Sequence, residues 1–138
     1  MKRILVVLLV LVISITVFAQ KTDFTTYDVI AKAGDVSIIV KDNDYRMLVG
    51  SLKKPKLNML MGYSKEQAIN RIDGILDFSK EGYTKNDRNV SVCGEIFLLN
   101  ITGKGDNEKY HFDAIDKKVK FSLTVEYCRL LKSKIQDL

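Results

Sequence analysis

The sequence predicts an α+β domain in which a mainly antiparallel sheet carries two amphipathic helices on one face, giving two layers. Short β-prone runs alternate with tight-turn signals, and two stretches space their apolar residues as a helix does. An apolar N-terminal segment is typical of a secretory signal peptide, which is removed when the mature chain is formed. The length of 138 residues is that of one domain.

Residues 1–19 are predicted to be a secretory signal peptide. Lys2 and Arg3 give a positive start, the run from Ile4 to Phe18 is almost wholly apolar, and Ala19 precedes a polar Gln20. The apolar run is shorter than the roughly 20 residues that a membrane-spanning helix needs. This end of the segment resembles Sec-type signals of Gram-negative bacteria. We therefore expect cleavage before Gln20, export to the periplasm or the outside, and no stable membrane span in the mature chain.

The first half of the mature chain is predicted to form short strands joined by turns. The predicted strands are residues 25–33, 36–40 and 45–52, with a short fourth over 57–61. Gly34-Asp35 and residues 41–44 mark the first two turns, and a lysine-rich loop around Pro55 follows the third strand.

A helix is predicted over residues 65–80. Ser64 with Gln67 three residues later fits a capping box, and apolar residues then recur at three- and four-residue steps. Gly82 is the expected stop.

The second half repeats this order. A long β-prone segment over 89–102 precedes predicted strands at 109–115 and 119–123, and a C-terminal helix is predicted over about 125–136 with Thr124 as its N-cap. Each half thus has about three strands and a helix, which suggests a duplication. Residues 20–138 are predicted to form one domain, because no linker or low-complexity stretch divides them.

Two readings stay open for the two cysteines, Cys93 and Cys128. In an oxidising compartment an even pair can form a disulfide. Alternatively, both are buried thiols that pack as small apolar residues. Neither lies in a Cys-x-x-Cys motif, so we expect no structural metal and no thioredoxin-like redox role.

Catalytic signals are weak. His111 is the only histidine, and Asp113 follows it on the same face of a predicted strand. The sequence has no Gly-x-Ser-x-Gly nucleophile motif, and residues 42–44 begin like a calcium loop but lack its later ligands. We therefore expect no cofactor and no metal, and an enzyme is less favoured than a binding protein.

The binding candidates are basic and aromatic side chains. The densest basic cluster is a loop of lysines, and three tyrosines are candidates for an exposed sheet face: Lys53, Lys54, Lys56, Tyr27, Tyr45 and Tyr110. A solvated loop is the simpler explanation of the lysines.

The function predicted from sequence is a non-catalytic binding or interaction module in the periplasm or outside the cell. Its partner is an unidentified protein, glycan or small ligand. The net charge of +5 falls when Lys2 and Arg3 leave, and the basic residues are dispersed, so nucleic acid is not an expected partner. Two alternatives are an exported inhibitor or immunity-type protein that presents the Lys53–Lys56 loop to a hydrolase, and a small hydrolase using His111 and Asp113.

Overall fold

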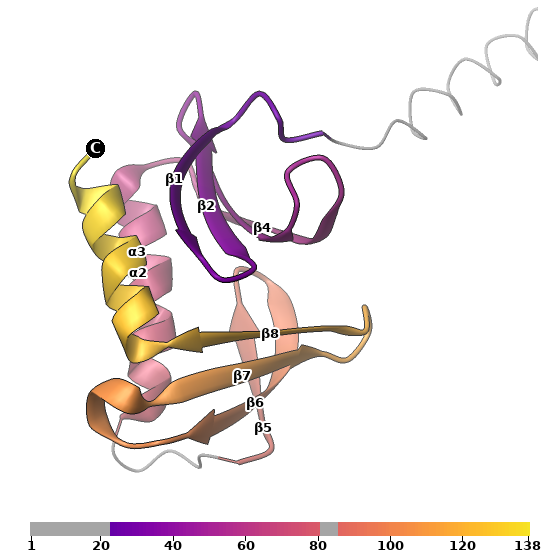
Figure 1. Cartoon of the computed structure of the whole chain (residues 1–138), viewed down its shortest axis with the longest axis vertical. Helices are drawn as coiled ribbons and strands as arrows, with labels where there is room; N and C mark the ends of the chain where they lie inside the picture. Colours follow the sequence, from indigo (N-terminus) through magenta and orange to yellow (C-terminus); the bar gives the residue numbers. More distant parts are fainter. Residues whose placement is uncertain (1–22, 81–85) are drawn as a thin grey trace, which may run out of the picture.

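The computed structural model describes residues 23–80 and 86–138, which form two halves with the same order of elements (Figure 1). In the first half the strands are β1 (Asp28–Ala33), β2 (Val36–Lys41), β3 (Asp44–Gly50) and β4 (Pro55–Gly62), followed by helix α2 (Lys65–Leu76). In the second half they are β5 (Arg88–Val92), β6 (Glu95–Thr102), β7 (Lys109–Ala114) and β8 (Val119–Thr124), followed by helix α3 (Val125–Gln136). Short 3-10 turns cover Asp77–Ser79 and Gly105–Asn107. The predicted export signal and Gly82 lie outside the described residues.

The predicted α+β class is confirmed, but the strands form two sheets where one was expected. Sheet A has the order β1-β2-β3-β4 and sheet B the order β5-β6-β7-β8, and both are antiparallel throughout. Strands β4 and β5 are therefore edge strands of different sheets. Helix α2, which follows β4 in the chain, contacts both of them.

The segment 89–102 contains a turn that the sequence analysis missed. Cys93 and Gly94 both have positive φ angles, 51° and 83°, and they join β5 to β6 as a two-residue hairpin turn. Asparagine or glycine is usual at the first of these positions, so cysteine gave no turn signal. With this turn, each half has four strands.

Both helices begin where their caps predict. The Ser64 hydroxyl accepts a hydrogen bond from the Gln67 amide at 3.1 Å, and the Thr124 hydroxyl accepts one from the Tyr127 amide at 3.0 Å. The Gln67 side chain completes a variant of the capping box, because its Oε1 accepts from the Tyr63 amide at 2.8 Å. The predicted helix 65–80 is α2 followed by the 3-10 turn, and the predicted C-terminal helix is α3.

One large core joins the described parts of both halves. The inner faces of sheets A and B and the buried stripes of α2 and α3 belong to the same apolar cluster. The two helices lie side by side across the two sheets (Figure 1), with α2 against β4 and β5 and α3 against β8 and β1. Lys132 of α3 forms an ion pair with Asp73 of α2 at 2.8 Å.

The other face of sheet A has a small apolar cluster of its own. Phe24, Ile39 and Leu48 are buried there, and Tyr27 and Leu52 pack against them. The segment before β1 thus covers this side of the sheet, and the guanidinium of Arg46 lies 5.6 Å from the centre of the Phe24 ring.

Candidate binding groove

Three adjoining hollows follow the outer side of α2. Their volumes are about 520, 140 and 350 Å³. The first and second share Asn70 and Arg71, and the second and third share Gly74 and Phe78, so the hollows form a continuous depression. Residues 60–63 at the end of β4 line one end, and residues 88–93 of β5 and its turn line the other. We call this depression the α2 groove.

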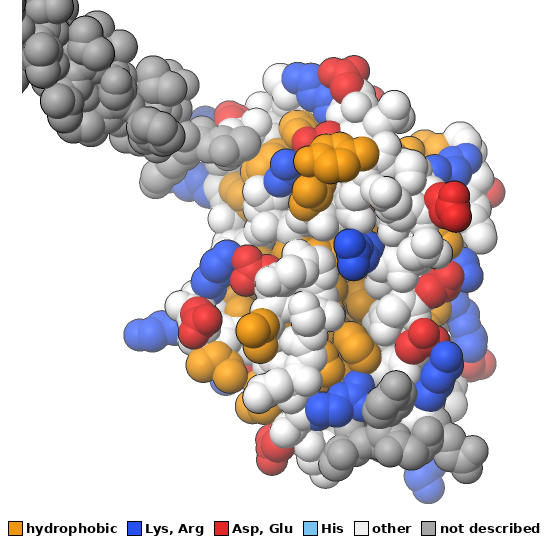
Figure 2. Space-filling view, turned by 180° about the vertical axis from the view of Figure 1, so that it is seen from behind, with side chains coloured by type: hydrophobic (Ala, Val, Ile, Leu, Met, Phe, Trp, Pro, Cys, Tyr) orange, Lys and Arg blue, Asp and Glu red, His pale blue; other side chains and the backbone are white. Residues whose placement is uncertain are grey.

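The spacing of residues along α2 creates the floor of the groove. Ala68, Ile72 and Ile75 form the buried stripe that anchors the helix to the core. Asn70, Arg71 and Gly74 fall on another side, which the sheets leave uncovered. In Figure 1 α2 lies behind α3; the view from behind in Figure 2 shows hydrophobic side chains exposed between separate Lys and Arg side chains in the middle of that face.

Gly74 gives the groove floor its low profile. It is the tenth residue of a regular helix, where glycine destabilises by about 1 kcal/mol relative to alanine. A Cβ built on Gly74 would meet nothing within 4 Å, so no neighbouring group of the described chain needs the space. The protein therefore carries a helix-destabilising residue without a packing reason, and its effect is to keep the middle of the groove open.

Arg71 is the cation at the centre of the groove. Its Nε donates to the backbone carbonyl of Met61, on the edge strand β4, at 3.4 Å. Within residues 23–80 and 86–138, Arg71 forms no ion pair. Two acidic residues that follow Arg71 pair elsewhere: Asp73 of α2 with Lys132 at 2.8 Å, and Asp77, just after α2, with Lys80 at 3.1 Å. The guanidinium can therefore bind an external anion without breaking an ion pair.

The two helices differ at these two positions. Counted from their N-caps, Arg71 of α2 matches Leu131 of α3, and Gly74 matches Lys134. Leu131 is fully buried and adds to the core, whereas Arg71 is exposed. The groove is thus a feature of α2 that α3 does not repeat.

Aromatic side chains lie at the two ends of the groove. Tyr63, at the β4 end, is 64% exposed although it is a large hydrophobic residue. At the β5 end the guanidinium of Arg88 lies 5.3 Å from the centre of the Phe78 ring, which fixes that wall. The groove therefore combines aromatic side chains at its ends with the polar and cationic side chains of Asn70 and Arg71, which line its first two hollows.

Cys93 and Cys128 are free thiols in this structure, so the disulfide that one reading allowed is not formed. Cys93 lines the middle hollow, and burial raises its pKa to about 11 despite the nearby Arg71 charge. Cys128 is buried in the core, where desolvation raises its pKa to about 12. Both thiols stay protonated at neutral pH, which makes them poor nucleophiles.

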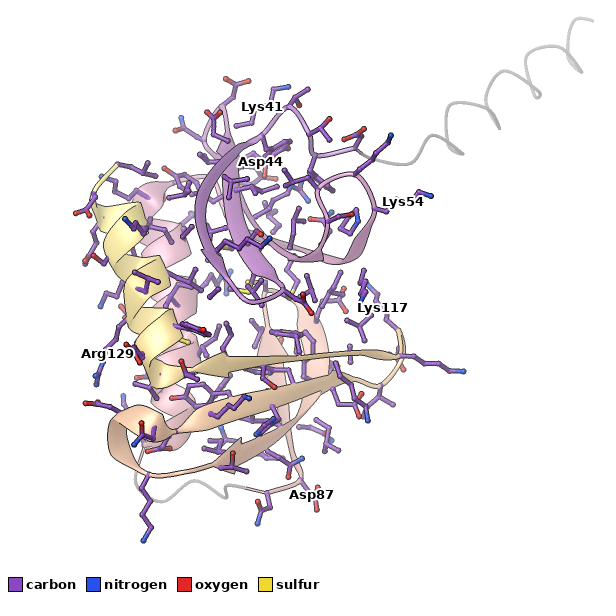
Figure 3. All side chains as sticks on the ribbon, viewed as in Figure 1. Lys41, Asp44, Lys54, Asp87, Lys117 and Arg129 are labelled. Atoms are coloured by element: carbon purple, nitrogen blue, oxygen red, sulfur yellow. The ribbon has the colours of Figure 1, made fainter. Side chains whose placement is uncertain are left out.

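The basic loop and the tyrosines named from sequence lie outside the groove. Lys53, Lys54 and Lys56 are exposed, and in Figure 3 Lys54 projects from the side away from the helices. Tyr27 is half-buried and donates from its hydroxyl to Asp44 at 2.9 Å. Tyr45 and Tyr110 are 6% and 0% exposed, so the expectation that they lie on an open sheet face is corrected: both belong to the inner core.

His111 lies on the outer face of sheet B among hydroxyl groups. Its Nε2 is 2.9 Å from the Thr102 hydroxyl, and its Nδ1 is 3.1 Å from the Ser122 hydroxyl. Asp113 shares this face but pairs across the strands with Lys120 at 3.6 Å. A triad needs a carboxylate on the second ring nitrogen, and here a threonine hydroxyl occupies that place.

A separate hollow of about 340 Å³ lies on the outer face of sheet B, lined in part by His111, Asp113 and Ser122. Across the two described ranges, no group of three His, Cys, Asp or Glu could hold a metal ion, and no helix there is long and apolar enough to span a membrane. No protein-family model, curated protein or solved structure matches the chain. The chemistry of the α2 groove therefore rests on its own residues.

Sequence reasoning missed Arg71 and Gly74. One local signal was present, since a glycine interrupts a strong helical pattern on its polar side. The walls of the groove could not be predicted, because β4 and β5 lie on either side of α2 only after the chain has split into two sheets.

Proposed function

We propose that the mature chain is an exported, non-catalytic binding module and that the α2 groove is its binding site. The observation that carries this proposal is Gly74, a costly residue in a helix that keeps a surface depression open without serving the packing of the described chain. A bound partner that approaches the helix backbone closely would explain that choice.

The export part of the proposal is supported by the sequence of residues 1–19, which has a basic start, an apolar run and a small residue before Gln20. On this proposal residues 20–138 are the mature protein, one domain in two layers that works in the periplasm or outside the cell. Its groove would then meet proteins, glycans or small ligands of that compartment.

The proposal that the protein is non-catalytic is supported by the surroundings of its candidate nucleophiles and of its candidate base, His111. Both ring nitrogens of His111 lie against hydroxyl groups, and burial raises the pKa of both thiols. A nucleophile usually needs a lowered pKa or an activating base that a third group orients. Neither thiol has a lowered pKa, and the His111 ring nitrogens contact hydroxyl groups, while Asp113 pairs with Lys120 instead of orienting the ring. An open groove with few fixed polar groups suits recognition better than chemistry.

Amide chemical shifts of the isotope-labelled mature chain test the proposal. The probes are capped pentapeptides, a chitin oligosaccharide and glycerol phosphate, each added separately up to millimolar concentration. We expect at least one probe to shift amides of residues 60–63, 67–78 and 88–93 as a group. The variant Gly74→Leu, which fills the floor while favouring the helix, should abolish those shifts.

Lys134→Leu is the matched control, because it places the same side chain at the same position of α3. It should leave the shifts unchanged. The proposal is overturned if none of the probes shifts the groove amides, or if the shifts persist in Gly74→Leu.

A further inference from the structure

We infer that the α2 groove binds an extended peptide segment that places a carboxylate on Arg71. This inference rests on the proposed function and names the class of ligand for the same site. Three features carry it: the available charge of Arg71, the length of the groove, and the two edge strands that flank it.

The charge of Arg71 selects an acidic ligand. The guanidinium forms no ion pair within the described ranges and keeps a single hydrogen bond, from Nε to the Met61 carbonyl. Its remaining N–H groups present the planar fork that a carboxylate matches with two parallel hydrogen bonds. Asn70, beside Arg71 in the first two hollows, adds an amide that can bind the same group or the peptide backbone.

The length of the groove favours an extended chain over a small molecule. The floor runs along α2 from Gln67 to Phe78, which is about 16 Å at 1.5 Å per helical residue. An extended peptide rises about 3.3 Å per residue, so about five residues span this distance. A small anion would fill only one of the three hollows.

The flanking strands can pair with such a chain. β4 and β5 are edge strands, each hydrogen-bonded to a neighbour strand on one side only. Edge strands offer backbone N–H and C=O groups to an added extended segment. The end of β4 reaches the groove, because the Met61 carbonyl accepts a hydrogen bond from Arg71 and residues 60–62 line the first hollow.

A membrane surface fits these features less well. Anionic lipid binding needs several clustered cations, each contributing about 1 kcal/mol, and the middle of the groove offers Arg71 on a concave floor. The lysines of the Lys53–Lys56 loop lie elsewhere on the molecule. We therefore choose the acidic peptide as the occupant.

Fluorescence anisotropy with three labelled pentapeptides tests the inference. The capped peptides alternate valine and threonine and differ only at the centre, which is glutamate, glutamine or lysine. We expect the glutamate peptide to bind the mature chain about tenfold more tightly than the glutamine peptide, since it adds a charge-assisted bidentate pair. Arg71→Gln should remove that preference, and Arg71→Glu should transfer it to the lysine peptide.

Lys54→Gln removes one exposed positive charge outside the groove and should change none of these affinities. Equal binding of the three peptides, a glutamate preference that survives Arg71→Gln, or Arg71-dependent binding to vesicles of phosphatidylglycerol would overturn the inference. The proposed function still stands if a neutral peptide or the chitin oligosaccharide shifts the groove amides and Gly74→Leu abolishes that shift. It fails separately if none of the probe classes reaches the groove.

Discussion

The thiols of Cys93 and Cys128 show how burial sets reactivity at single residues. Desolvation raises the pKa of Cys93 to about 11 and that of Cys128 to about 12. At pH 8 about one Cys93 thiol in a thousand is then ionised, and the ionised fraction of Cys128 is smaller still. We expect folded protein to react with a thiol reagent at pH 8 far more slowly than a free cysteine does.

The same reagent in urea should modify two thiols per chain, because unfolding exposes both and no disulfide joins them. A count of zero in urea, with the mass of an intramolecular disulfide, would contradict the free-thiol state. Since the unfolded thiols ionise at lower pH than the folded ones, stability should also fall as pH rises from about 9 toward 12.

Gly62 contrasts with Gly74, because its neighbours forbid a side chain. It has φ +149°, and an added Cβ would lie 2.5 Å from the Cβ of Gln67, which caps α2. We expect Gly62→Ala to lower the free energy of unfolding by about 2 kcal/mol or more. Gly34→Ala, at φ +60° with open space around it, carries the backbone penalty alone and should lose about 1 kcal/mol. Urea unfolding followed by circular dichroism measures both, and equal losses would contradict the predicted clash.

The caps of the two helices are the best test at the scale of the element. Ser64→Ala and Thr124→Ala each remove a hydroxyl that satisfies a free amide at a helix start. Each should lower the free energy of unfolding by about 1 kcal/mol. Ser133→Ala, at an exposed position inside α3, is the control and should not destabilise the protein. Chemical unfolding curves give the free energy of unfolding of all three variants, and a cap variant as stable as the control would refute the role of the caps.

Elements set by local sequence were predictable, and elements set by distant contacts were not. The helix boundaries followed from Ser64, Thr124 and the spacing of apolar residues. The number of sheets depended on whether β4 pairs with β5, and in the structure they are edge strands of different sheets. The Cys93 turn was missed because a cysteine at positive φ has no sequence signal of its own.

Tyr45, which was predicted to lie on an exposed sheet face and is buried, shows that distant contacts also decide which face of a strand is covered. In β3 both faces are apolar: Tyr45, Met47 and Val49 pack inward, while Leu48 is buried under Phe24 on the other side. Alternation therefore could not tell which face was exposed. For the groove, the glycine in α2 was visible in the sequence, but the walls and the unpaired state of Arg71 required the fold.

At the scale of the whole molecule, the two halves depend on one another. Residues from both sheets and both helices form one core, and each helix contacts both sheets. We therefore expect the mature chain to unfold in a single cooperative transition. The chain has six tyrosines and no tryptophan, so tyrosine fluorescence and far-ultraviolet circular dichroism are suitable probes.

The midpoints reported by these two probes in urea should coincide. An isolated fragment of residues 20–80 should lack stable structure, because its inner apolar face would lose the second half. Two separate transitions, or a fragment that folds alone, would contradict a shared core.

The central claim is that Gly74 keeps the α2 groove open for a partner at the expense of stability. The most direct measurement determines the free energy of unfolding and the affinity for the glutamate pentapeptide side by side in wild type, Gly74→Ala and Gly74→Leu. The account predicts that alanine raises the free energy of unfolding by up to about 1 kcal/mol, and that affinity falls from glycine to alanine to leucine. Stabilised variants that bind the peptide as tightly as wild type would contradict it.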